Sequence, residues 1–184
     1  MRRQKIIATT LPVNSVLRRD NVKYDYIDSF QGSFIDESNS ITSQQIGKAF
    51  FRSAPGWVEK LFIVRNKIVA VFGLKTSRTA TNRQQLLNNF KCEPNEQLGL
   101  FKVFDRTDNE VILGEDDKHL NFRVSLFKID SAENQKSKNL IISTTIEFKN
   151  WFGKLYFVPV RPFHKLIVPA MLKGIIKEIE AQQP

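Results

Sequence analysis

The chain's longest apolar-rich stretch, residues 151–180, reads WFGKLYFVPVRPFHKLIVPAMLKGIIKEIE. At about 100° per residue on an ideal helix, Lys154, Arg161 and Lys165 fall on one narrow stripe with apolar side chains almost all round. This pattern predicts that the first half of the segment is buried. After Pro169 the apolar positions form a single stripe, made by Met171, Leu172, Ile175, Ile176 and Ile179.

A proline inside a helix removes one backbone hydrogen bond and clashes with the preceding turn, so the change of phase predicts a kink or a break near Pro169. The second half has polar residues on the side away from its apolar stripe. We therefore expect residues 151–180 to form a C-terminal helix that lies on an apolar surface.

That surface is expected to be a sheet. Residues 23–30 alternate loosely, and four further runs at 97–106, 110–113, 119–129 and 139–148 are separated by turn residues, which is typical of an antiparallel meander. One face of the third run is apolar and the other polar: Leu120, Phe122, Val124 and Leu126 oppose His119, Asn121, Arg123 and Ser125. A one-faced sheet must cover its apolar side. The sequence predicts an α+β fold in which the C-terminal helix does so.

Two shorter helices are predicted between the first strand and the meander. Residues 42–45 (TSQQ) match a capping box and begin a helix that ends near Arg52. Pro55 begins a second helix with apolar residues at helical spacing as far as Gly73. Residues 77–96 are polar and are interpreted as a mobile or disordered loop.

Composition is that of one globular domain over residues 1–184, with residues 1–21 as an N-terminal arm. A chain of 184 residues, 41% hydrophobic, buries roughly 70% of the surface that its unfolded form exposes. Fifteen phenylalanines suit a dry core or a dry pocket. The single cysteine, Cys92, excludes an internal disulfide and favours a reducing compartment.

Charge and targeting signals limit both the expected location of the protein and the classes of partner that it could bind. The N-terminal apolar run is too short for a signal peptide and there is no uncharged run of membrane-spanning length, so we expect a cytoplasmic protein. The net charge of +9 makes nucleic acid and anionic membranes candidate partners. The cations are dispersed and no nucleic-acid-binding signature accompanies them, so we expect no nucleic acid, while membrane association through residues 151–165 stays an alternative.

The polar residues offer few constellations. Residues 114–119 (GEDDKH) gather three carboxylates and an imidazole, which we interpret as a hairpin turn rather than a metal site. His119 and Arg123 share a strand face, which the apolar residues between them indicate to be the outer one. His164 is either a hydrogen-bonded core residue or the partner of Asp116 or Asp117 in an acid–base or ligand-orienting pair.

Several segments resemble a bacterial family, the domain of unknown function 2867 (DUF2867). They include DYIDSF at 25–30, GEDDKHLNFR at 114–123 and RPFHKLIV at 161–168. The order of elements also resembles the helix-grip fold of the Bet v 1/START-like (SRPBCC) superfamily. The resemblance implies a curved antiparallel sheet wrapped around the long C-terminal helix, an apolar cavity, and a short-chain dehydrogenase-like partner protein. No G-x-G-x-x-G fingerprint is present, so the chain has no dinucleotide domain of its own.

The first hypothesis is therefore a domain that binds a small apolar or amphipathic molecule between sheet and helix. Its candidate ligand-binding residues are Asp116, His119, Arg123, Trp151, Tyr156, Arg161 and His164. The alternative is a cyclase-, isomerase- or hydrolase-like enzyme in the same pocket, with His164 or His119 as acid–base group. No catalytic residue, metal or cofactor is assigned from the sequence, and the oligomeric state is left open.

Overall fold

The structure is a computed structural model that describes residues 5–19, 22–58, 83–131 and 136–183. Its elements follow the predicted order of an arm, a first strand, helices, a meander and a long C-terminal helix. They are β1 (Ile7–Thr9), the 3-10 turn η1 (Val16–Arg18), β2 (Tyr26–Ile35), α1 (Ser43–Arg52), α3 (Arg83–Asn89), β3 (Gln97–Leu98), β4 (Phe101–Arg106), β5 (Glu110–Asp116), β6 (Leu120–Asp130), β7 (Ser137–Phe148) and α4 (Trp151–Ala181).

The strands form one antiparallel sheet in the order β1-β2-β7-β6-β5-β4-β3. Strands β3 to β7 are the predicted meander, and β2 pairs with the free edge of β7 over ten residues, from Tyr26 opposite Ile146 to Ile35 opposite Ser137. This confirms the predicted α+β class and the helix-grip arrangement. The first strand runs farther than its alternation indicated because its pairing with β7 continues through Gly32.

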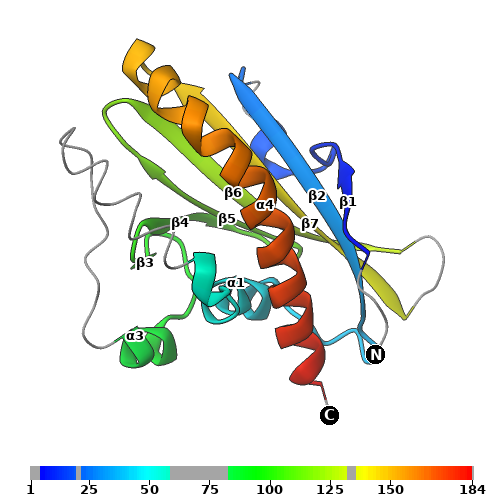
Figure 1. Cartoon of the computed structure of the whole chain (residues 1–184). Helices are drawn as coiled ribbons and strands as arrows, with labels where there is room; N and C mark the ends of the chain where they lie inside the picture. Colours follow the sequence, from blue (N-terminus) through cyan, green and yellow to red (C-terminus); the bar gives the residue numbers. More distant parts are fainter. Residues whose placement is uncertain (1–4, 20–21, 59–82, 132–135, 184) are drawn as a thin grey trace.

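Helix α4 crosses one face of this sheet diagonally (Figure 1), as predicted. Its second half is buried against the sheet and α1 through Val168, Met171, Leu172, Ile175, Ile176 and Ile179. Gly32 of β2 permits this close approach, since a Cβ atom there would lie 2.7 Å from Cδ1 of Ile176. Burial of these side chains contributes roughly 1.5–3 kcal/mol each to the free energy of folding.

Two expectations for α4 need correction. Of the kink or break expected near Pro169, the break is absent, because the helix is continuous through Pro159, Pro162 and Pro169. Its first half is not buried all round: within residues 151–165 only Gly153 and Phe157 are buried, and Trp151 is 72% exposed. Apolar composition reports which positions tolerate burial, but only the face toward the sheet has a neighbour to bury them.

Helix α1 closes the lower part of the core beside α4 (Figure 1). Its capping box is confirmed: Thr42 Oγ1 accepts from Gln45 N, and Gln45 Oε1 accepts from Thr42 N at 2.7 Å. Beyond Val58 the predicted second helix lies outside the described residues. Part of the predicted polar loop is helical, because residues 83–89 form α3.

The opposite face of the sheet carries the N-terminal arm. Glu110 of β5 is fully buried there, and its carboxylate accepts hydrogen bonds from Ser15 Oγ at 2.5 Å, Val16 N at 2.7 Å and Ser125 Oγ at 2.5 Å. Leu11 and Leu17 pack beside it on Ile112. The polar face predicted from alternation is therefore partly covered by the arm, through apolar contacts and one buried carboxylate.

Candidate functional site between the sheet and the C-terminal helix

A small polar group lies where β2 faces α4. Nδ1 of His164 is 3.0 Å from Oδ2 of Asp28, and the hydroxyl of Tyr26 donates to the same oxygen at 2.7 Å. The side chains of His164 and Asp28 are only 17% and 12% exposed. An imidazole, a carboxylate and a phenol are thus held together, mostly shielded from water.

Local periodicity explains why these side chains meet. Tyr26 and Asp28 alternate with Ile27 and so point to the face of β2 that also carries Phe34, which is buried beneath α4. On α4, His164 falls within about 60° of the buried residues Phe157 and Val168 on an ideal helix. Both elements therefore turn these polar residues inward.

The group of Tyr26, Asp28 and His164 lies between two apolar clusters. Above it Leu120, Ile146 and Phe157 form one cluster, which the rings of Tyr26 and Tyr156 join. The main core begins in the row of Asp28 itself, with Val124 and Leu113, which lie in register with Asp28 and its cross-strand neighbour Thr144. Each polar group buried in this row loses its hydration, which costs free energy unless a hydrogen bond replaces it.

Two atoms of this row are buried with no hydrogen-bond partner in the described part of the chain. They are Oδ1 of Asp28 and Oγ1 of Thr144. Leaving such a group unsatisfied costs on the order of 1–3 kcal/mol, and more for a charged group. One carboxylate oxygen and one hydroxyl are therefore available to a further polar group.

Electrostatics keeps the phenol protonated. Burial raises the pKa of Tyr26 well above its ordinary value, and the hydrogen bond to the Asp28 carboxylate raises this pKa further. The guanidinium of Arg161 opposes this more weakly; its carbon lies 5.6 Å from the centre of the Tyr26 ring. Tyr26 is consequently a hydrogen-bond donor at neutral pH.

The contact with Asp28 also selects the tautomer of His164. Because a carboxylate only accepts, Nδ1 carries the proton that points to Asp28, and in the neutral ring Nε2 is the basic nitrogen. A carboxylate that orients an imidazole in this way supports either proton transfer or the fixing of a ligand's polar end.

The comparison with protein families matches the family described as Protein of unknown function (DUF2867) over residues 22–171. The match covers most of the chain, including β2 and the part of α4 that carries His164. The chain belongs to the DUF2867 family. Among curated proteins the comparison finds no match.

Membership of DUF2867 confirms the resemblance carried by residues 25–30, 114–123 and 161–168. The match begins after the N-terminal arm and ends at Met171 within α4. It therefore contains the whole of the Tyr26, Asp28 and His164 group. Placement in the START-like superfamily remains a prediction.

Of the residues predicted from sequence, this DUF2867 chain brings Arg161 and His164 together and joins them with Tyr26 and Asp28. The carboxylate beside His164 is Asp28, not Asp116 or Asp117. Sequence reasoning missed Tyr26 and Asp28 as site residues. The sequence does carry a signal for them: Asp28 is an acid on a strand face that also carries Phe30 and Phe34.

Asp116 and Arg123 lie on the other face of the sheet, as the alternation indicated for Arg123. They form an ion pair of 2.8 Å, and the Arg123 guanidinium lies 3.5 Å from the centre of the Phe104 ring. Neither residue contacts the group around His164. Both residues therefore lie on the face of the sheet opposite to α4.

His119 contacts the residues at the beginning of α4. Its Nδ1 is 3.2 Å from Oδ1 of Asn150, the N-cap residue of the helix, and its ring packs on Phe152 at 4.6 Å between centres. A Cβ atom at Gly153 would collide with the His119 carbonyl oxygen, so the two segments are in close contact. In this position His119 has a structural role.

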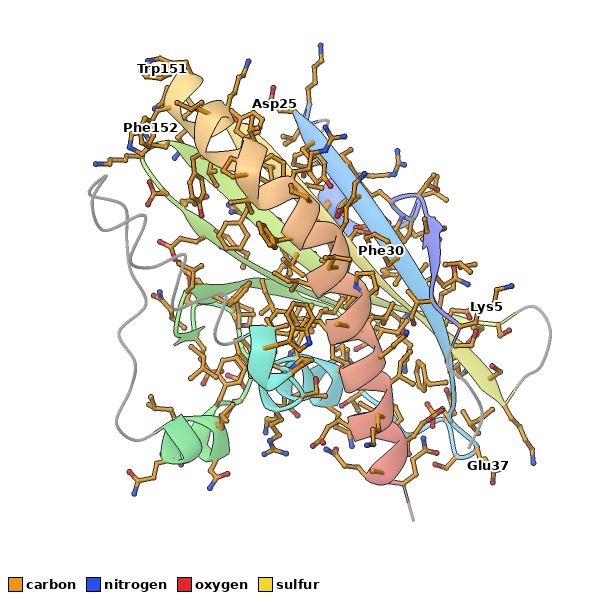
Figure 2. The ribbon with its side chains drawn as sticks, in the orientation of Figure 1. Lys5, Asp25, Phe30, Glu37, Trp151 and Phe152 are labelled. Carbon is orange, nitrogen blue, oxygen red and sulfur yellow. The ribbon has the colours of Figure 1, made fainter. Side chains whose placement is uncertain are left out.

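Trp151 and Tyr156 occupy different surroundings from each other. Trp151 lies at the outer end of α4 next to Phe152 (Figure 2), and it is mostly exposed to solvent. Tyr156 is half-buried and packs against the upper apolar cluster. Of the two, only Tyr156 borders the interior near Tyr26.

Two pockets in the described part of the chain lie away from Asp28 and His164. One lies beneath the N-terminal arm, and the other lies beside the start of α1, near Thr42 and Lys128. Over the same residue ranges, no three His, Cys, Asp or Glu side chains are grouped so that they could hold a metal ion. Nor does any helix in these ranges combine the length and apolarity needed to span a bilayer.

Proposed function

We propose that this chain binds a small amphipathic molecule between the sheet and α4, with the group of Tyr26, Asp28 and His164 holding the molecule's polar end. The proposal is carried by one observation: Asp28 Oδ1 and Thr144 Oγ1 are buried side by side in register without hydrogen-bond partners among the described residues. A ligand hydroxyl or amide that donates to Asp28 would remove this cost of burial.

The surroundings define the rest of the ligand. The upper cluster of Leu120, Ile146 and Phe157 supplies apolar contact beside the polar group, and Arg161 lies at its exposed margin. An apolar body with one polar end satisfies both features. A fully charged anion does not, because Asp28 is the nearest buried group.

The test is the ligand content of the purified full-length protein. Native mass spectrometry and solvent extraction are expected to reveal a co-purifying amphipathic molecule, and the protein is expected to bind N-phenyl-1-naphthylamine in competition with it. Thr144→Val, which removes the hydroxyl and keeps the shape, should weaken binding about tenfold, the value of one hydrogen bond made inside a protein.

The neighbouring Thr145→Val serves as the matched control, because Thr145 points to the other face of the sheet. Chemical denaturation of both variants establishes that they fold. A protein that carries no ligand and does not bind the probe, with both variants folded, contradicts the proposal.

A second candidate, favoured by the contact between Asp28 and His164, is acid–base catalysis on the same ligand. His164 Nε2 acts as the base, and the protonated Tyr26 or the resulting imidazolium acts as the acid, in an isomerisation, cyclisation or hydrolysis. Incubation of the extracted ligand with the protein should convert it, and His164→Gln should stop the conversion, while native mass spectrometry should still detect the ligand bound to this variant. Recovery of the unaltered ligand after long incubation rules out this activity on it.

A further inference from the structure

The outer face of the sheet carries a pocket that no part of the proposed function uses. It has a volume of about 380 Å³, within the usual range for small-molecule sites. Leu17 of the arm and Tyr24 form one wall, and strands β4 and β5 form another with Phe104 and Ile112. The arm is held in place by the buried carboxylate of Glu110 and by the hydrogen bond from the Tyr24 hydroxyl to the Leu17 carbonyl.

The floor of this pocket contains two buried polar atoms without a hydrogen-bond partner in the described ranges. They are Oγ1 of Thr145, a residue that is 1% exposed, and Oδ1 of Asn121. The orientation of the Asn121 amide follows from its neighbour: Nδ2 donates to Glu147 at 3.4 Å, which leaves Oδ1 as the unpaired atom. Both groups accept hydrogen bonds.

The charges of the pocket favour a cation. Arg123 is already neutralised, because Nη2 is paired with Asp116 and Nη1 donates to the Phe122 carbonyl at 2.9 Å. The remaining charged lining residues are the acids Asp105 and Glu147. The positive net charge of the chain opposes cation binding only weakly, because charges beyond about 8 Å are screened at physiological ionic strength.

We infer that this pocket binds a small organic amine, with the ammonium group donating to Thr145, Asn121 and Glu147 and an apolar body resting against Leu17, Tyr24 and Phe104. The amine supplies several donors where the pocket presents acceptors. Its charge complements the two acids, and its apolar part matches the wall formed by the arm. The site lies on the face opposite to α4, so it does not depend on the proposed function.

Three probes of one shape test this inference: 2-phenylethylamine, the neutral 2-phenylethanol and the anion phenylacetate. Titration of the full-length protein, followed by calorimetry and ligand-observed NMR, should show the amine binding more tightly than the alcohol and phenylacetate binding least. Thr145→Val removes the hydroxyl while preserving the shape, and should weaken amine binding about tenfold. Because it removes an unpaired buried group, this variant is expected to fold.

Two further variants test separately the contribution of charge and the face of the sheet on which the amine binds. Glu147→Gln should weaken amine binding about two- to fivefold, the range for a partly exposed ion pair, and leave the alcohol unchanged. Thr144→Val alters the adjacent residue on the α4 face and should leave amine binding unchanged. Equal binding of phenylacetate, an unchanged affinity in Thr145→Val, or no amine binding at millimolar concentration each overturns the inference, whatever the outcome for the α4 face.

Discussion

Cys92 shows how burial decides the chemistry of a single residue. The thiol is fully buried, and desolvation raises its pKa to about 12. A raised thiol pKa means that the unreactive protonated form dominates below that pH. We expect native protein at pH 8 to react with Ellman's reagent far more slowly than protein unfolded in guanidinium, as followed by absorbance. Rapid reaction of the native protein would contradict the burial of this thiol.

Close packing against the same thiol requires a glycine at position 47 of α1. A Cβ atom at Gly47 would collide with Sγ of Cys92. Gly47→Ala should therefore lower the free energy of unfolding by about 1–3 kcal/mol, as overpacking does in tight cores. Urea denaturation measures this difference.

Gly56→Ala is the control for this substitution, because a Cβ atom there meets nothing within 4 Å. The double variant Gly47→Ala with Cys92→Ala should recover part of the loss, since the colliding sulfur is gone. If Gly47→Ala and Gly56→Ala have the same stability, the predicted collision does not occur.

At the scale of the element, α4 presents an apolar strip to solvent. Trp151, Leu155, Val158 and Leu166 are 72%, 58%, 68% and 64% exposed, and they fall within about 80° of one another on an ideal helix. The cations Lys154, Arg161 and Lys165 flank the strip, and residues 151–165 contain no acid. Aromatic and aliphatic residues beside cations are typical of helices that lie on anionic membranes.

We expect the protein to co-sediment with vesicles containing phosphatidylglycerol, and less with phosphatidylcholine alone. Each of Lys154→Glu and Lys165→Glu should weaken binding at least about fivefold, since one cation near an anionic surface contributes about 1 kcal/mol. Leu155→Ser with Val158→Ser should weaken it also. Binding that ignores salt and lipid charge, or dimerisation through the strip in analytical ultracentrifugation, would count against membrane docking.

The same helix shows what periodicity could and could not predict. After Pro169 one apolar stripe identified the buried face correctly, because polar residues filled the other side. Before it, apolar residues on all sides gave no preferred face, so the burial of Phe157 and the exposure of Val158 depend on where the sheet lies. The pairing of His164 with Asp28 joins residues 136 positions apart, and it follows only from the register of α4 on β2.

At the scale of the whole molecule, strand alternation predicted the faces of the sheet better than helical periodicity predicted the buried face of α4. It placed Arg123 on the outer face. Tyr26 and Asp28 share one side of the predicted strand at residues 23–30, although their role was not recognised. It did not predict that an arm would cover the outer face. That cover depends on Glu110, whose carboxylate joins the arm to the sheet across more than ninety residues of sequence.

Glu110 should therefore control the docking of the arm. Glu110→Gln removes the charge that accepts from Ser15 and Val16, and should lower the free energy of unfolding by about 1–3 kcal/mol. It should also speed tryptic cleavage after Arg18 and Arg19, as followed by mass spectrometry. The exposed Glu37, at the other end of the molecule from Trp151 (Figure 2), provides the control substitution Glu37→Gln.

The two faces of the sheet give this prediction a second readout. If the arm forms a wall of the outer pocket, Glu110→Gln should weaken 2-phenylethylamine binding, while binding of N-phenyl-1-naphthylamine on the α4 face should be unaffected. Loss of both would indicate general unfolding, and loss of neither would mean that the arm stays docked without Glu110. Loss of amine binding alone would show that one buried carboxylate couples the arm to the chemistry of a pocket that it does not line.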